Sequence, residues 1–290
     1  MSTDRAPKFT IYSSEASQWA MVPLLGIQEK GIQPHEYEHR EIDLIGAGNF
    51  DAEYLKINHN GTLPALTTPS LDTPLEESAD ILEFLDRLEP SRGTSLAPKD
   101  AATKERAAEL ITLVHSMDLN SNLILLTARD TEELEKVKAT FYDFITTRQR
   151  VLEENAARDP SHPFYGPKAA DNNGVYKVYT TSSTSPEHHD FFKSTHEGYK
   201  AFANAFGQLE SLLALPYAAG DHLTYADLNI IPWLSHVLCF AGAKDFNDFA
   251  ALESLVRKTV PGFSVGPELR QWWKTIQERE SFKKIYPVLH

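Results

Sequence analysis

The sequence predicts a small α/β domain over residues 1–88 and an all-α domain over residues 101–290, joined by a linker at 89–100. Three observations support this division. The chain has 290 residues, more than one compact core usually covers. Before residue 90, short segments in which apolar and polar residues alternate are followed in turn by segments with helical spacing. Beyond residue 100, nearly every apolar pattern has helical spacing. Between them lies a stretch rich in Pro, Gly and Ser.

In the first half, the order of elements is βαβαββα. The expected strands lie at 8–13, 37–44, 65–67 and 72–75, and the expected helices at 19–28, 50–57 and 77–88. The first helix is followed by Lys30 and Gly31, and a glycine just past the last turn is a common helix end. This order fits a four-stranded mixed sheet covered by helices.

In the second half, helices are expected at 101–119, 131–155, 191–214, 225–240, 246–255 and 267–278. Residues 159–189, rich in Pro, Gly, Asn, Ser and Thr, are expected to form a long irregular excursion, either disordered or functional. The clearest helix start is Thr224, with Asp227 three positions later, which together form a capping box.

Composition excludes several classes of function. There are 28 basic and 41 acidic residues, a formal charge of -13, and no basic stripe, so nucleic-acid binding is not expected. No apolar run is long enough to cross a membrane, and the polar start is unlike a signal peptide, which predicts an intracellular protein. The single cysteine, Cys239, lies in an apolar helical pattern and is interpreted as a buried, inert thiol. The histidines do not have metal-ligand spacing, and no metal is expected.

The stretch from Asn58 to Leu66, Asn-His-Asn-Gly-Thr-Leu-Pro-Ala-Leu, is a polar turn that leads through Leu63 and Pro64 into an apolar run. Glu77 and Ser78 open a helix shortly after it. A backbone turn next to an acidic residue and a hydroxyl at a helix start suits a peptide-like ligand with charged ends.

Three motifs in this order resemble the cytosolic glutathione transferases: Asn-x-Asn-Gly-x-Leu-Pro-Ala-Leu, the helix beginning Glu-Ser-Ala-Asp-Ile-Leu, and Ala-Gly-Asp-His-Leu-Thr-Tyr-Ala-Asp-Leu. The resemblance covers most of the chain and implies a thioredoxin-like N-terminal domain. It also implies a cis bond between Leu63 and Pro64, which presents the Leu63 backbone to the cysteinyl unit of glutathione. Glu77 would meet the γ-glutamyl ammonium and Ser78 its carboxylate. For the glycyl carboxylate, Asn49 is one candidate, with Lys56 and His59 as alternatives.

Catalysis in such proteins depends on a group that stabilises the glutathione thiolate, because a thiol with a pKa of about 8.5 is mostly protonated at neutral pH. Counting back from the end of the first helix, Ser17 falls where serine-type members carry their active hydroxyl. Its O–H would donate to sulfur at a helix N-terminus. Ser13, Ser14 and Tyr12 remain alternatives.

Two neighbours complicate this assignment. Pro23 falls inside the expected helix and would remove one of its hydrogen bonds, and the Glu15 carboxylate would raise the pKa of a nearby thiol unless it points away. Because the first domain contains no cysteine, a mixed disulfide between a protein thiol in that domain and glutathione is not expected.

The sequence therefore predicts a glutathione transferase that uses glutathione as co-substrate without a metal. The resemblance further implies a cytoplasmic detoxification enzyme, a homodimer, and a small electrophilic, hydrophobic second substrate. A glutathione-dependent isomerase or lyase, a glutathione-binding structural protein of the same fold, and an interaction module without glutathione remain alternatives. Candidate contacts for the second substrate are His115, Asn120, Phe141, Tyr142, Phe164, Tyr165 and Tyr176.

Overall fold

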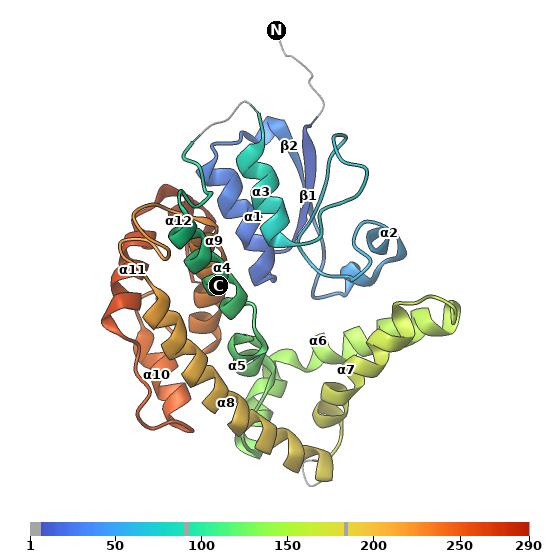
Figure 1. The fold of residues 1–290 in the computed structure, drawn as a ribbon. Helices are drawn as coiled ribbons and strands as arrows, with labels where there is room; N and C mark the ends of the chain where they lie inside the picture. Colours follow the sequence, from blue (N-terminus) through green and yellow to red (C-terminus); the bar gives the residue numbers. More distant parts are fainter. Residues whose placement is uncertain (1–6, 90–92, 183–184, 290) are drawn as a thin grey trace. The chain divides into compact units, whose positions relative to one another are not determined.

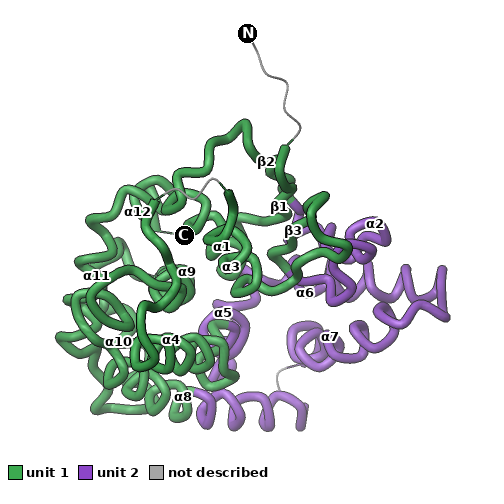
Figure 2. The backbone as a smooth tube through the Cα atoms, turned by 45° about the horizontal axis from the view of Figure 1, so that its top comes forward, with its two compact units in different colours: residues 1–41, 63–121, 199–290 green, residues 42–62, 122–198 purple. Residues whose placement is uncertain are grey.

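The computed structural model describes residues 7–89, 93–182 and 185–289 and divides them into two compact units. Unit 1 comprises residues 1–41, 63–121 and 199–290, and unit 2 comprises residues 42–62 and 122–198 (Figure 2). Both the α/β part and the C-terminal helices thus contribute to unit 1. The domain boundaries expected from the sequence are a different division of the chain and stay a prediction. Within the expected linker, residues 90–92 lie outside the described residues.

Unit 1 contains a three-stranded mixed sheet in the order β2-β1-β3. The strands are β1 (Phe9–Ser13), β2 (Tyr37–Glu41) and β3 (Ala65–Thr67). β2 is parallel to β1, and β3 is antiparallel to it, with Tyr12 opposite Ala65. The expected fourth strand at 72–75 is reduced to one antiparallel bridge between Leu66 and Leu75. Pro74 has no N–H for a ladder, which agrees with this correction.

Helices α1 (Gln18–Glu29) and α3 (Ser78–Arg87) lie side by side next to the sheet (Figure 1). Buried residues of the strands and both helices form one apolar core: Phe9, Ile11, Ile27, Leu66, Ile81 and Leu85. A Cβ at Gly26 would lie 2.5 Å from a methyl carbon of Leu82, so the two helices approach closely where α1 has a glycine.

The remaining helices of unit 1 begin and end close to the expected positions. They are α4 (Ala101–Val114), α9 (Tyr225–Phe240), α10 (Phe249–Arg257), α11 (Pro267–Gln277) and the unexpected α12 (Glu280–Ile285). Helix α9 is buried along most of its length and packs against α1, α4 and α10. Short 3-10 turns occur at Pro34–Glu36, Gly48–Phe50 and Met117–Leu119.

Unit 2 joins a segment of the N-terminal half to helices of the C-terminal half. It contains α2 (Ala52–Leu55), α5 (Asn122–Leu126), α6 (Thr131–Arg158) and α7 (Tyr165–Thr180), and α8 (Pro186–Leu212) begins in it. The expected irregular excursion at 159–189 is therefore largely helical. α7 packs on α6 through Val178 and Tyr179, which are buried with Leu134 and Ile145.

Among the described residues, no helix combines the length and apolarity needed to cross a membrane.

Candidate active site

The candidate ligand-binding residues of unit 1 lie at one end of its strands, just past the last paired residues of β1 and β3. Continuing the β1–β3 register beyond Tyr12 and Ala65 sets Pro64 opposite Ser13. Continuing the Leu66–Leu75 bridge in the same way sets Pro64 opposite Glu77 on the other side. The turn before β3, the loop after β1 and the start of α3 therefore lie at the same end of the sheet.

Leu63 and Pro64 are joined by a cis peptide bond, which confirms the expectation from the resemblance. Both residues are buried and directly precede β3. Within the described residues, neither the N–H nor the C=O of Leu63 takes part in a hydrogen bond. These two groups can therefore pair with a ligand backbone in the manner of an added strand.

Glu77 and Ser78 stand at the start of α3, Glu77 as the N-cap and Ser78 as the first helical residue. Glu77 is exposed and its side chain does not cap the helix, whereas Ser78 is only 4% exposed. The first N–H groups of a helix lack intrahelical partners and attract negative charge. The Glu77 carboxylate could therefore accept from an ammonium group of a ligand. The Ser78 hydroxyl and the first N–H groups of α3 could donate to a carboxylate of the same ligand.

Ser17 is the N-cap of α1, as the expected helix start requires, but its hydroxyl does not cap. The Ser17 N–H donates to the Ser14 carbonyl (3.0 Å), and its carbonyl accepts from the Ala20 N–H (3.1 Å). No hydrogen bond of the Ser17 hydroxyl occurs among the described residues. The first turn of α1 carries no acidic residue. The helix end therefore keeps a positive potential that suits an anion next to this hydroxyl.

The alternative hydroxyls are engaged differently. The Ser13 hydroxyl is fully buried and lies 2.5 Å from His39 Nε2. The Tyr12 hydroxyl accepts from Arg40 Nη1 at 3.4 Å. The Ser14 side chain, 4% exposed, has no hydrogen-bond partner in the described part of the chain. Of the four hydroxyls, only those of Ser17 and Ser14 can thus turn to a ligand without losing a protein partner.

The two residues that complicated the Ser17 assignment are now placed. Pro23 lies inside α1 and is buried, so the helix includes it and still begins at Gln18. Glu15 is exposed, and its N–H donates to the Glu41 carboxylate at 3.1 Å. The Glu15 side chain thus has access to water, which screens its charge.

Two further features lie beside Ser17, and sequence reasoning missed the first of them. The Gln18 side-chain oxygen is buried and has no partner among the described residues, which leaves an acceptor available to a ligand N–H. The ring of Trp19 stacks on His115, with 3.8 Å between centroids, and His115 Nε2 lies 2.9 Å from the Asn229 side-chain oxygen. A glutamine in a first helical turn carries no distinctive pattern, so no sequence signal pointed to Gln18, whereas His115 was already a candidate contact for the second substrate.

Asn49 belongs to unit 2 and is committed to the protein. It is 2% exposed, its amide nitrogen donates to the Gly61 carbonyl (2.6 Å), and its amide oxygen accepts from Arg148 (3.4 Å). The contribution of Asn49 to ligand binding therefore remains a prediction that these contacts do not favour.

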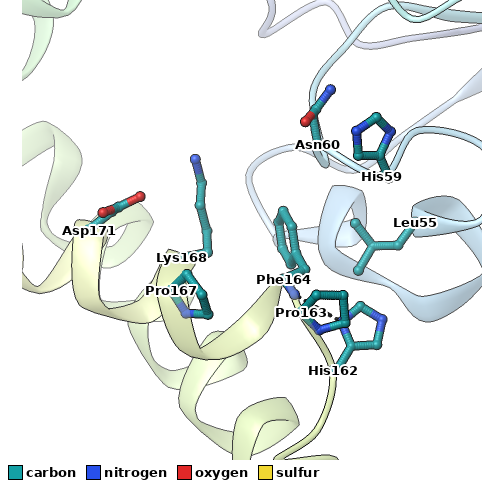
Figure 3. Close-up of a pocket in the computed structure, with 9 residues that line it drawn as sticks. All are labelled: Leu55, His59, Asn60, His162, Pro163, Phe164, Pro167, Lys168 and Asp171. Atoms are coloured by element: carbon teal, nitrogen blue, oxygen red, sulfur yellow. Dashed lines mark hydrogen bonds between the residues drawn. The ribbon is translucent and has the colours of Figure 1, made fainter.

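Unit 2 also contains a cavity of about 490 Å³ between the loop after α2 and the start of α7. Figure 3 shows the residues around it: Leu55, His59, Asn60, His162, Pro163, Phe164, Pro167, Lys168 and Asp171. The Phe164 N–H donates to His162 Nδ1 at 3.2 Å. The cavity is open to solvent and is lined by side chains of both charges, so its lining does not indicate one kind of ligand.

Cys239 lies on α9 as expected but is half-buried rather than buried, and burial raises the pKa of its thiol. His188 is buried in unit 2, with Nδ1 2.8 Å from the Ser185 hydroxyl and Nε2 2.9 Å from the Val178 carbonyl. In the described ranges, no group of three or more His, Cys, Asp or Glu side chains is arranged to hold a metal ion.

Residues 11–93 match the family model described as glutathione S-transferase, N-terminal domain. No curated protein matches the sequence. Among solved structures, the chain is similar to the β-etherase LigF from Sphingobium. The two are 16% identical, with a TM-score of 0.61 over 97% of this chain and 99% of that one.

Two further structures are similar over nearly the whole chain. A maleylacetoacetate isomerase from Methylobacterium extorquens, with malonate and glutathione bound, is 18% identical, with a TM-score of 0.57 and 96% of each chain covered. Human glutathione S-transferase T1-1 is 17% identical, with a TM-score of 0.57 over 96% of this chain and 88% of that one. Residues 11–93 thus match the glutathione S-transferase N-terminal domain family, and the chain as a whole has the fold of the glutathione transferases.

Proposed function

We propose that the protein is a glutathione transferase in which Ser17 stabilises the thiolate of bound glutathione. The observation that carries the proposal is the Ser17 hydroxyl, which heads α1 without capping it. It belongs to the same compact unit as the cis Leu63–Pro64 turn and the start of α3. A hydroxyl free to donate, at a helix end with positive potential, is what a thiolate requires.

In this proposal the peptide is held by its backbone and its γ-glutamyl end. The cysteinyl N–H and C=O pair with the C=O and N–H of Leu63. Glu77 accepts from the γ-glutamyl ammonium. The Ser78 hydroxyl and the first N–H groups of α3 donate to the carboxylate.

The chemical step begins when the thiol loses its proton to solvent. The Ser17 O–H then donates to the sulfur, which lowers the pKa of the thiol. The sulfur lone pair attacks the electrophilic carbon of the second substrate, forming a C–S bond while the leaving group departs with its bonding electrons. Trp19, two positions after Ser17, stacks on His115, and the two rings offer an aromatic surface for a hydrophobic electrophile. We further propose a cytoplasmic homodimer with a detoxifying role, on the resemblance to the family.

Binding of glutathione tests recognition separately from chemistry. Isothermal titration should give heat with glutathione and with S-methylglutathione, since the proposed contacts do not require a free thiol. Glu77→Gln and Ser78→Ala should each weaken binding about tenfold, as expected for losing a charge-assisted hydrogen bond. Glu83→Gln is the matched control, because Glu83 lies on the same helix and pairs with Arg87.

A glutathione-binding protein of the same fold without turnover is the competing reading. Turnover should be measured with a panel of small aryl halides and epoxides, by following loss of the free thiol. Conjugation by the unaltered protein, reduced strongly in Ser17→Ala, supports the transferase. Binding without conjugation of any electrophile would favour the structural alternative.

A further inference from the structure

We propose that Arg148 of α6, with Phe164 and Tyr165 at the start of α7, positions the glutathione-binding turn by holding the segment that ends at Leu63. We call these three residues the brace. All of them, and residues 44–62 on which they act, belong to unit 2. The inference rests on the proposed function and assigns a positioning role to helices that lie far from the turn in sequence.

Arg148 is the first part of the brace. Its Nη1 donates to the Leu44 carbonyl (3.5 Å) and the Asn49 side-chain oxygen (3.4 Å). The guanidinium lies 4.2 Å from the centroid of the Phe50 ring and 5.0 Å from that of Phe144. Arg148 therefore contacts segment 44–50 at the Leu44 backbone, the Asn49 side-chain amide and the Phe50 ring.

The placement of the Arg148 guanidinium is not explained by a contribution to stability. Among the described residues, no carboxylate pairs with Arg148, and burial lowers the pKa of its guanidinium to about 10. A partly buried cation held by neutral oxygens and rings recovers little of its desolvation cost. A cation with several rigid donors does, however, fix the geometry of what it touches. Its contacts converge on the segment that leads to the ligand turn.

Asn49 connects Arg148 to the turn, because its side chain contacts both. Its amide nitrogen donates to the Gly61 carbonyl at 2.6 Å, two residues before Leu63. The Tyr54 hydroxyl and the Asn58 amide both donate to the Thr62 carbonyl, at 2.6 and 3.0 Å. The peptide that precedes Leu63 is thus fixed by side chains of its own segment, and that segment is fixed by Arg148.

Phe164 and Tyr165 hold the same segment from α7. Gly61 has φ +60°, and a Cβ there would come within 2.7 Å of the Phe164 ring. Figure 3 shows this ring projecting from the start of α7 toward the turn that carries His59 and Asn60. The Tyr165 hydroxyl donates to the Phe50 carbonyl at 3.0 Å. Gly61 therefore suits both the backbone conformation and the approach of the ring.

Displacement of the turn should affect ligand affinity, because Leu63 binds through its backbone and has no side-chain freedom with which to compensate. Loss of the brace loosens the segment that holds the Thr62 carbonyl, and with it the peptide group that carries the Leu63 N–H, and it changes neither the ligand nor the Ser17 side chain. Misplacement of a binding group by about 1 Å weakens binding strongly. The expected signature is a higher KM for glutathione, with kcat at saturating glutathione and KM for the electrophile unchanged.

The test is glutathione titration of the full chain carrying Arg148→Ala, Arg148→Lys or Arg150→Ala. Arg150 is the matched control on the same helix, where its guanidinium pairs with Glu154 at 2.9 Å on the surface. Arg148→Ala should raise the Kd of glutathione about tenfold, and Arg148→Lys about threefold, because lysine keeps the charge but loses the planar stack. Arg150→Ala should leave the Kd within about 1.5-fold.

A double-mutant cycle tests the path through Asn49. Because Arg148 and Asn49 act on Gly61 in series, the pair Arg148→Ala with Asn49→Ala should raise the Kd little more than the worse single change. If Arg148→Ala does not fold, Tyr165→Phe takes its place. That variant removes only the hydroxyl bonded to Phe50, and it should raise the Kd about twofold.

Two negative results are distinguishable. A folded Arg148→Ala protein that binds glutathione as tightly as the unaltered chain would overturn the brace and leave the transferase proposal intact. An unaltered chain that gives no heat with glutathione would refute the proposed function and the brace with it.

Discussion

Helices α1 and α9 both begin with a hydroxyl residue, yet the two hydroxyls are used in opposite ways. Thr224 at the start of α9 is buried and forms a capping box with Asp227. The Asp227 carboxylate accepts from the Thr224 N–H at 2.8 Å and from its hydroxyl at 3.2 Å. Ser17 at the start of α1 has no acidic residue three positions later, and no partner of its hydroxyl occurs among the described residues.

The surroundings of the two helix starts differ in the same sense. Asp227 also accepts from the Ala218 N–H (2.7 Å) and from Trp272 Nε1 (2.8 Å), so the α9 start ties three parts of unit 1 together. At the α1 start, the buried Gln18 oxygen has no described partner. A completed hydrogen-bond set indicates a structural role, whereas open donors and acceptors at a helix end indicate room for a ligand. The comparison predicts stability effects at α9 and activity effects at α1.

The largest expected effect is on stability, from Asp227→Ala. The change leaves buried donors on Thr224, Ala218 and Trp272 without an acceptor, and breaking such a network costs about 3–5 kcal/mol. Denaturant unfolding should show this loss in the free energy of unfolding. The KM for glutathione of the remaining folded protein should not change. A loss below about 1 kcal/mol would contradict the structural role.

Ser17→Ala should have the next largest effect, and on activity alone. We expect kcat/KM to fall about 100-fold, which corresponds to about 2.7 kcal/mol of transition-state stabilisation. The free energy of unfolding should change by less than about 0.5 kcal/mol, because the hydroxyl caps nothing. Ser14→Ala is the control, since that hydroxyl also has no described partner. A larger loss of activity in Ser14→Ala would move the catalytic role to Ser14.

Thr224→Ala should be milder than either. It removes the capping hydroxyl but keeps the Asp227 carboxylate and the backbone donor, so about 1 kcal/mol of stability should be lost. Thermal unfolding measures the difference. A drop in conjugation rate without a change in stability would break the contrast between the two helix starts.

The smallest effect concerns acid stability next to the α9 start. Burial raises the pKa of Asp86, but hydrogen bonds from Lys30, the Leu96 N–H and the Tyr225 hydroxyl lower it and prevail. A carboxyl with a lowered native pKa contributes stability above its unfolded pKa and loses it as pH falls through the native value. Asp86→Asn should therefore lose less stability than the unaltered protein, by about 1 kcal/mol, on acidification from about pH 5 to 3. If the free energy of unfolding of both proteins fell equally over this pH range, the stabilising role of Asp86 would be refuted.

Sequence reasoning predicted both helix starts because their signals are local. The capping box of Thr224 and Asp227 is readable from residue types alone, and the lysine–glycine end of α1 fixed the count back to Ser17. The cis bond at Pro64 and the start of α3 at Ser78 followed from motifs in the same short stretch. Local signals were sufficient for the helix starts, whereas the cis bond and the role of Ser17 came from the resemblance that these motifs carry.

Features that depend on distant contacts were not predicted. Helix α7 contains glycine, proline and asparagine residues of low helix propensity. It is held by tertiary contacts such as the Asn172 amide donating to the Gln149 side chain at 2.8 Å. The bond of Asn49 to Gly61 and the grip of Arg148 likewise join residues with no sequence pattern in common. The sequence therefore suggested a ligand contact for Asn49, which stays a prediction, and gave no sign of its bond to the turn.

The central claim is that the Ser17 hydroxyl stabilises the thiolate of bound glutathione, and thiolate absorbance tests it most directly. Ultraviolet difference spectra of the glutathione complex should be recorded against pH for the unaltered protein and for Ser17→Ala at saturating ligand. We predict a thiol pKa at least one unit below that of free glutathione in the unaltered complex, and a return toward the free value in Ser17→Ala. Tight binding with an unshifted thiol pKa in the unaltered complex, or an equal shift in both proteins, would contradict the claim.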